Sequence, residues 1–455
     1  MTEIQQKQDE KLGKAPLGRL ILSMAIPAVI AQVVNVLYNI VDRIYIGHIP
    51  EVGAIALTGL GICFPILMLI SAFSAFIGMG GAPLAAIELG KGNREGAEKI
   101  LGNGVTILIL LSIILTIIFA IFKIPMLYAF GGSDATILYA EQYLNIYLCG
   151  TIFVQIAMGL NMFITSQGQA KIGMLSVLIG AVINIILDPI LIFVCGMGVR
   201  GAALATIISQ GCSAAWVLRF LLSEKSSIRI KTKYLRPEPK IVGMIAALGI
   251  SPFVMQSTES LVNITLNSGL QTYGGDLYVG SMTILTSVMQ LIATPVQGIG
   301  QGTQPIISYN YGAGNKDRVR KTFRISLIVT LTVTTLCCIM TVLFPTVFAR
   351  MFTNQQELIQ IVGKVLPIYM AGIWIFGIQM ACQSAFMGMG QAKISLFLAL
   401  LRKVILLIPL AIILPKLFGV IGIYYAEPIA DITAALTAGT LFYVNFEKIL
   451  DKGAI

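Results

Sequence analysis

The sequence has few charged residues and almost no histidine. Asp, Glu, Lys and Arg make up 11% of its 455 residues, about half their usual share in a soluble domain. His48 is the single histidine, which excludes a metal site built from several histidines. The seven cysteines lie in or beside apolar runs, and none forms a CxxC pair near a histidine. We interpret them as small buried side chains and do not expect zinc or disulfide chemistry.

The sequence instead contains long hydrophobic runs. Hydrophobic residues make up 56% of the chain, and whole windows of about 20 residues are apolar, as membrane-spanning helices require. The sequence therefore predicts an all-α integral membrane protein. We expect twelve spans, at residues 17–46, 54–82, 101–122, 137–165, 170–194, 200–222, 241–270, 278–306, 322–346, 358–387, 394–415 and 420–444.

Basic residues gather in alternate connections between these spans. They are concentrated before span one and in the connections from span two to three, six to seven and eight to nine. The positive-inside rule places these connections, and with them both termini, in the cytoplasm. Because the basic residues lie between apolar spans rather than on one face, nucleic-acid binding is not expected. The spans themselves are expected to contain almost no Lys or Arg.

The chain repeats itself after 222 residues. The residues Gly80, Pro83, Gly90, Gly92 and Asn93 recur as Gly302, Pro305, Gly312, Gly314 and Asn315, and GQAKI at Gly168 recurs at Gly390. Each half contains six spans, so the halves are parallel repeats related by a pseudo-twofold axis along the membrane normal. We expect an N-lobe at 1–222, a flexible cytoplasmic linker at 223–240 and a C-lobe at 241–455.

Span five carries the polar residues that stand out most. The stretch VINIILDPILIF at Val182 is apolar except for Asn184 and Asp188. An ionisable residue inside a bilayer is costly and therefore indicates a functional site. Asn184 and Asp188 are four apart and share a helix face, and Pro189 leaves the carbonyl of Ile185 without its helical partner. This oxygen-rich face suits a proton or a hard monovalent cation. The repeat places Leu406 and Leu410 at the positions equivalent to Asn184 and Asp188, so only the N-lobe retains this polar pair.

Span one supplies a second carboxylate. Its polar face at helical spacing consists of Gln32, Asn35, Tyr38, Asn39 and Asp42. Pro27 removes a helix bond to Ser23, so this helix can bend. Asp42 has two interpretations: it lies at the outer interface paired with Arg43, or it faces Asp188 across the lobe. In the second case the two carboxylates share a site that holds a proton or a cation.

Other polar residues lie in apolar surroundings. Thr206, Asn161 and Gln210 are candidates for a cavity in the N-lobe, although a helix threonine usually bonds its own i−4 carbonyl. Glu259 is the main acid of the C-lobe. Glu427 and Asp431 are four apart in span twelve and suit either the membrane surface or a cavity, so their role stays open.

Together these motifs resemble the MATE family of multidrug and toxic compound extrusion transporters. The resemblance covers nearly the whole chain and rests on PAVIAQVVNVLYNIVDRIYIGHI, GMGGAPLAAIELGKGN, NIILDPILIF, GVRGAALATIISQ, QPIISYNYGAGN and the repeated GQAKI. It is similar to the bacterial DinF-like and MepA-like branch. That branch implies an N-lobe coupling site at Asp42, Asn184, Asp188 and Thr206, cavity positions at Tyr38 and Asn161, and bending at Pro27. The C-lobe site of the NorM-like branch is incomplete, because span ten offers only Gln379 and Gln383.

The resemblance implies a monomeric, multi-pass antiporter of the cell membrane. It would export small organic cations in exchange for H⁺ or Na⁺, with no other cofactor, and the sequence leaves the coupling ion open. The expected drug cavity comprises Gln32, Asn35, Tyr38, Asn161, Gln210 and Glu259, with bending at Pro27 and Pro189. The alternative is a flippase for lipid-linked precursors, which would need a basic cleft. An intramembrane enzyme is not expected, because a single histidine removes most catalytic constellations.

Overall fold

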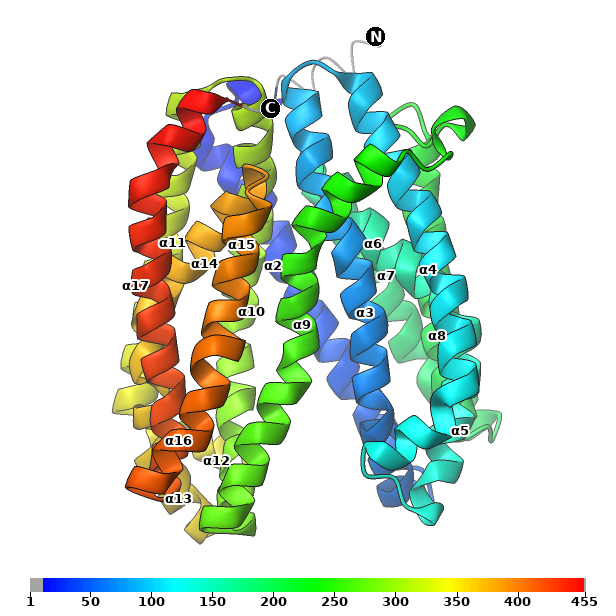
Figure 1. The fold of residues 1–455 in the computed structure, drawn as a ribbon. Coiled ribbons are helices and arrows are strands. Elements are labelled where there is room, and N and C mark those ends of the chain that lie inside the picture. The colour runs from blue at the N-terminus through cyan, green and yellow to red at the C-terminus, as the bar shows by residue number, and fades with distance from the viewer. Residues whose placement is uncertain (1–10, 454–455) are drawn as a thin grey trace.

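The computed structural model describes residues 11–453, and every regular element in that part of the chain is helical (Figure 1). The first half contains α2 (Leu17–Gly47), α3 (Gly53–Gly90), α4 (Arg94–Ala129), α5 (Asp134–Cys149), α6 (Thr151–Ser166), α7 (Ala170–Pro189), the π-helix η1 (Ile190–Val194) and α8 (Val199–Leu222). The short η2 (Thr232–Tyr234) lies in the linker. The second half contains α9 (Pro239–Gly274), α10 (Asp276–Gly312), α11 (Lys316–Leu343), α12 (Pro345–Phe352), α13 (Gln356–Tyr369), η3 (Met370–Gly372), α14 (Ile373–Gly388), α15 (Ala392–Leu400), the π-helix η4 (Leu401–Leu407), α16 (Ile408–Phe418) and α17 (Val420–Lys452).

The prediction of twelve spans is confirmed. Eleven helices in the described residues are long and apolar enough to cross a membrane, and α5 with α6 forms a twelfth that is bent by 59°. The helices α2 and α17 have their outer ends, Leu17 and Lys452, on the same side of the molecule (Figure 1). We call this side the terminal end. The predicted location of both termini in the cytoplasm rests partly on residues 1–10 and 454–455, which lie outside the described residues.

The repeated GN pairs are the turns that end one span and begin the next. Gly92 and Gly314 adopt positive φ angles of 76° and 72°, which glycine tolerates at the end of a helix. Asn93 then caps α4, because its Oδ1 accepts from the N–H of Gly96 at 3.0 Å. The sequence repeat at an offset of 222 residues therefore corresponds to a repeated turn between two helices, and both turns lie at the terminal end.

Glycines bring the two halves into backbone contact near the terminal end. A Cβ atom on Gly90 would lie 2.0 Å from the carbonyl oxygen of Tyr309, and one on Gly312 would lie 2.0 Å from that of Ile87. Gly90 and Ile87 are the repeat equivalents of Gly312 and Tyr309. The same contact is thus made twice, as a twofold axis between α3 and α10 requires.

Two further helix pairs cross at glycines. On α9, a Cβ at Gly249 would lie 1.9 Å from the oxygen of Phe76 in α3, and on α10 a Cβ at Gly302 would lie 2.5 Å from Cα of Ala25 in α2. The helices α3 and α9 pack where they cross and then diverge away from the terminal end (Figure 1). The halves are therefore in close contact on the terminal side.

The linker differs from the flexible segment that its composition predicts. The side-chain Oε1 of Gln167 accepts hydrogen bonds from Ser226 Oγ and from the backbone N–H groups of Ser227 and Ile228, at 2.9, 2.8 and 3.3 Å. Farther along, Lys231 pairs with the buried Glu98 at 2.5 Å. The linker is thus packed onto the first half, because buried polar groups on α4 and α6 need its donors.

The segment before α2 contacts both halves. Leu12 is 1% exposed and packs in one cluster with Ala170 of α7 and Ile306 of α10. Its carbonyl oxygen accepts from Asn310 Nδ2 at 3.0 Å and from Arg318 Nε at 3.1 Å. This segment adds polar and apolar contacts to the glycine contacts on the terminal side.

We predict that Gly312→Ala lowers the free energy of unfolding by about 1–3 kcal/mol, because the new methyl group forces α3 and α10 apart. The control is Gly243→Ala in α9, where a Cβ would meet nothing within 4 Å and where alanine should stabilise the helix slightly. Thermal unfolding of the purified variants in detergent compares them. Equal midpoints for the two variants would contradict the close contact.

Candidate functional site

The structure brings the two N-half carboxyl groups together. Asp42 of α2 and Asp188 of α7 are 8% and 0% exposed, their helices pack against each other, and the two carboxyl groups are close enough to interact electrostatically. Asn184 Nδ2 donates to Asp188 Oδ1 at 3.3 Å. Three buried oxygens then lack a partner in the described residues: Asp42 Oδ1, Asn184 Oδ1 and Asp188 Oδ2. Such a set of oxygens fits a proton or Na⁺.

Arg43 does not occupy this site. Its guanidinium lies over the ring of Phe64, 5.1 Å from the ring centroid, whereas the neighbouring Asp42 is buried. In the structure Asp42 therefore lies buried near Asp188 and forms no ion pair with Arg43. The pair has no basic side chain bonded to it in the described residues, so its charge has to be balanced in another way.

Tyrosines and Thr206 complete the surroundings of the pair. The Thr206 hydroxyl donates to the carbonyl of Ala202 at 3.0 Å, so it offers the site only its lone pairs. Tyr143 of α5 is 3% exposed and lies near Thr206 and Asp42. Tyr38 lies near Asp42 and Gln210 of α8. Sequence reasoning missed Tyr143, because its position on α5 does not indicate which side chains of other helices lie next to it.

The chain beyond Asp188 is wound more loosely than an α-helix. α7 ends at Pro189, and the π-helix η1 follows at once. Proline cannot donate the backbone hydrogen bond that a continuous α-helix needs there, and π-helical turns occur often at functional sites. The local geometry thus follows from the DP pair. In contrast, α2 runs unbroken through Pro27.

The remaining residues of the predicted cavity do not lie together in the structure. Gln32 of α2 donates from Nε2 to Gln301 Oε1 of α10 at 3.0 Å, which joins the two halves. Asn35 is half-buried on the same face of α2. Asn161 lies elsewhere, because its amide donates to the carbonyl of Gly173 at the start of α7. Asn184 follows about 16 Å farther along that helix, so Asn161 is not a neighbour of the carboxyl pair.

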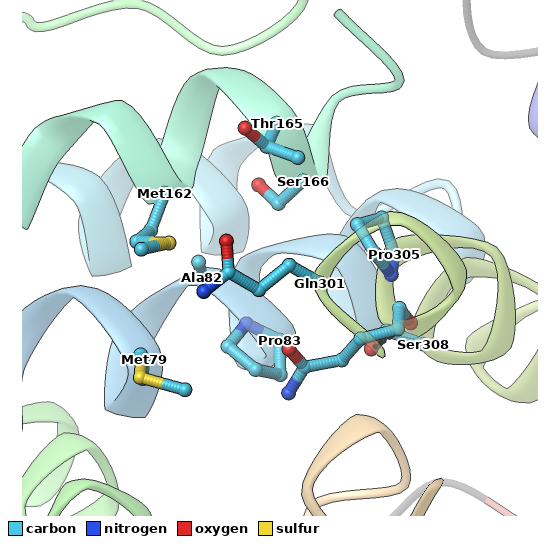
Figure 2. A pocket seen from close by; sticks show the side chains of 10 residues that line it. Met79, Ala82, Pro83, Met162, Thr165, Ser166, Gln301, Pro305 and Ser308 are labelled. Carbon is cyan, nitrogen blue, oxygen red and sulfur yellow. Dashed lines mark hydrogen bonds between the residues drawn. The ribbon is translucent and has the colours of Figure 1, made fainter. Parts of the chain in front are cut away.

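A small pocket lies between the halves, toward the terminal end. Figure 2 shows its walls, with Met79 and Pro83 from α3, Met162 from α6, and Gln301 and Pro305 from α10. Pro83 and Pro305 are repeat equivalents, as are Met79 and Gln301. The pocket therefore lies at the pseudo-twofold axis. The first half lines it with apolar side chains and the hydroxyl groups of Thr165 and Ser166, and the second half adds the amides of Gln301 and Gln304.

The expectation that the spans contain almost no Lys or Arg is wrong for span eleven. Arg402 lies inside the C-half and donates from Nη2 to Glu427 Oε1 at 2.7 Å and from Nε to Asp431 Oδ1 at 2.6 Å. Glu427 and Asp431 are 5% and 1% exposed. They are therefore not open to a cavity, but bind the guanidinium of Arg402 inside the second half.

The adjacent lysine binds the acid of α9. Lys403 is 8% exposed; its ammonium contacts the Glu259 carboxylate and donates to the carbonyl of Met255 at 2.7 Å. Sequence reasoning missed Lys403 as well. The signal was present, because two adjacent basic residues inside an apolar run need acidic partners.

Comparison with known proteins identifies the family. The MatE family model matches twice, at residues 27–190 and 252–413, once in each half. The chain belongs to the MATE family. Its two matches coincide with the internal repeat, and MATE proteins are membrane transporters rather than enzymes.

Relatives of MATE type match over almost their full length. The multidrug export proteins MepA of Staphylococcus haemolyticus and Staphylococcus aureus strain N315 are 24% and 25% identical, over 98% and 97% of this chain and 99% and 98% of theirs. A MATE crystal structure in the bent conformation aligns with a TM-score of 0.90 at 23% identity, covering 100% of both chains. An outward-facing MATE family transporter aligns with a TM-score of 0.90 at 23% identity, covering 96% of this chain and 98% of its own. These structures show that the fold is shared.

We predict that Arg402→Met destabilises the protein by about 3–5 kcal/mol, because it leaves two buried carboxyl groups without their cation. The triple variant Arg402→Met/Glu427→Gln/Asp431→Asn should recover most of this loss, since it also removes the unpaired charges. Thermal unfolding and monodispersity in detergent report both effects. A single variant as stable as the wild type would show that Arg402 does not hold the two acids.

Proposed function

We propose that this protein is a multidrug efflux antiporter that exports amphipathic organic cations in exchange for H⁺ or Na⁺. The observation that carries the proposal is the buried pair of Asp42 and Asp188, with oxygens left unpartnered. Two carboxylates in contact repel each other unless a proton or cation lies between them. The names of the MepA relatives point to the class of substrate.

The exchange follows from competition for one negative charge. The coupling ion and the exported cation both neutralise the carboxyl pair, so binding of one releases the other. A ligand shifts a transporter between two states only if it binds them unequally, and the pair provides this difference. Asn184 and Thr206 would bind or orient the ion, and Gln32, Asn35, Tyr38 and Gln210 would line the drug path.

Alternating access requires the halves to separate on the terminal side, which we place in the cytoplasm. In this proposal residues 1–222 and 241–455 move as lobes. Pro27 is suited to the bending of α2, because the first part of that helix packs on α10 at Gly302 while Asp42 lies in its second part. Bending at Pro27 would move Asp42 while the contact of Ala25 with Gly302 stays in place, and it would loosen the Gln32–Gln301 bond between the halves.

The flippase alternative is less well supported by the charges. A pyrophosphate headgroup needs uncompensated basic side chains. Arg402 and Lys403 are each bound to carboxylates, which leaves no net positive charge at this position. A MOP superfamily transporter from Pyrococcus furiosus nevertheless shares the fold, with a TM-score of 0.88 and 23% identity over 96% of this chain and 98% of its own. The reverse polarity of the binding pocket of that transporter suggests a different function for it. Fold alone does not decide the substrate.

Efflux of ethidium from proteoliposomes tests the proposal. A sodium gradient and a pH gradient are imposed separately, so that the gradient which drives efflux identifies the ion. If neither gradient drives efflux by folded protein, the assignment as a cation exporter fails and the flippase alternative gains.

We predict that Asp42→Asn and Asp188→Asn each abolish gradient-driven efflux, because an amide cannot exchange a proton or carry the charge that the two ligands share. Asp317→Asn, which alters an exposed acid in the first turn of α11, is the control and should transport as the wild type does. Each variant should unfold near the wild-type temperature, since the amide keeps the shape of the carboxyl group. Full transport by either of the first two would refute the coupling role of the pair.

A further inference from the structure

The residues just before α2 lie across the boundary between the halves. We call residues 11–16 the strap. The side chain of Leu12 is 1% exposed and packs on the turn between α6 and α7 of the first half, where a Cβ atom on Gly168 would lie 3.2 Å from Leu12 Cδ2. Leu12 shares a buried cluster with Ala170 of α7 and with Ile306 of α10. This one leucine therefore has apolar neighbours in both halves.

The backbone of the strap is hydrogen-bonded to the second half. Asn310 Nδ2 of α10 donates to the carbonyl of Leu12 at 3.0 Å, and Arg318 Nε of α11 donates to the same carbonyl at 3.1 Å. The Nη2 group of Arg318 donates to the carbonyl of Ala15 at 2.5 Å. Arg318 forms no ion pair with any residue that the structure describes. Its rigid fork of donors therefore serves to hold the strap on the second half.

The strap is the repeat counterpart of the end of the linker. At the offset of 222 residues, residues 12–16 correspond to residues 234–238. The linker segment precedes α9 and is bonded to α4 of the first half, whereas the strap precedes α2 and is bonded to α10 and α11 of the second half. Each segment thus leads into one half while it is held by the other. The position equivalent to Arg318 is Gly96, so the linker lacks the guanidinium that holds the strap.

We propose that the strap is a latch that stabilises the closed state of the terminal side. Arg318 fixes the strap on the second half, and the side chain of Leu12 closes onto the α6–α7 turn of the first half. When the halves separate on this side, the strap stays with Arg318 and Leu12 leaves Gly168. The loss of this apolar contact opposes opening. The inference rests on the alternating access of the proposed function, and it is independent of which compound or ion is carried.

The distance between two spin labels on the terminal side tests the latch. Nitroxides are attached through a ketone-bearing unnatural residue at the repeat-equivalent, exposed positions of Glu95 and Asp317, so that the seven native cysteines stay unchanged. Pulsed electron paramagnetic resonance then measures the distance in lipid nanodiscs without an ion gradient. The variants are Leu12→Ser, Arg318→Met and Arg318→Lys. The control is Leu144→Ala, because Leu144 is 0% exposed in a cluster formed by the first half alone.

Leu12→Ser should raise the ratio of the long-distance to the short-distance population about tenfold. This change corresponds to about 1.4 kcal/mol, which is the order of the free energy of burying one leucine side chain. Arg318→Met should shift the ratio in the same direction, because the strap loses the donors that hold it, and Arg318→Lys should shift it less, since an ammonium retains a donor. Leu144→Ala should lower the thermal unfolding midpoint and leave the ratio unchanged, because its cavity lies within one half.

An unchanged ratio in Leu12→Ser overturns the latch, and so does an equal shift in Leu144→Ala. The absence of a long distance in the wild type and in every variant overturns it as well, because the terminal side then does not open. Failure of the proposed substrate class gives a different result: no dye is exported under either gradient, while the distance populations still respond to Leu12→Ser.

Discussion

The cost of placing charge inside a membrane governs how the polar residues of this protein are arranged. Every buried ionisable group needs a partner, and the two halves meet this need differently. In the second half Arg402 and Lys403 neutralise the acids with fixed cations of the chain itself. In the first half no basic side chain of the described residues forms an ion pair with Asp42 or Asp188, which lie close to each other. This difference is why we propose the first half as the site of coupling.

Duplication explains how one fold came to contain both solutions. The repeat preserves the corners at Gly92 and Gly314 and the glycine contacts at Gly90 and Gly312, which hold the halves together. It does not preserve the charged groups: Leu406 and Leu410 occupy the positions of Asn184 and Asp188. The backbone contacts tolerate no side chain, so they restrict sequence strongly. Inside each lobe, the requirement on the sequence is that buried charges are balanced. Residues at other positions can provide the balancing charge.

The sequence alone was sufficient for features that depend on local pattern. The twelve spans, the repeat and the pairing of Asn184 with Asp188 follow from hydrophobic length and helical spacing, and the structure contains them all. The contact of Asp42 with Asp188 was one of two interpretations, because the end of a span cannot be placed within a turn from composition. The partners of Arg402 were missed because Glu427 and Asp431 belong to a different helix, and spacing within a helix says nothing about neighbours across helices. Tyr143 was missed for the same reason.

The packing of the linker sets the true boundary between the halves. Its last polar contact joins Asn103 Oδ1 to the backbone N–H of Glu238 at 2.6 Å, one residue before α9 begins. During synthesis the first half therefore lacks part of its own surface until Glu238 has emerged, and only then are Gln167, Glu98 and Asn103 satisfied. A split protein divided after Leu222 would remove the linker partners of Gln167 Oε1, Glu98 Oε2 and Asn103 Oδ1 from that fragment. Division between Glu238 and Pro239 would keep the linker contacts of Gln167, Glu98 and Asn103 within one fragment. In the intact chain the packed linker leaves almost no slack between the halves.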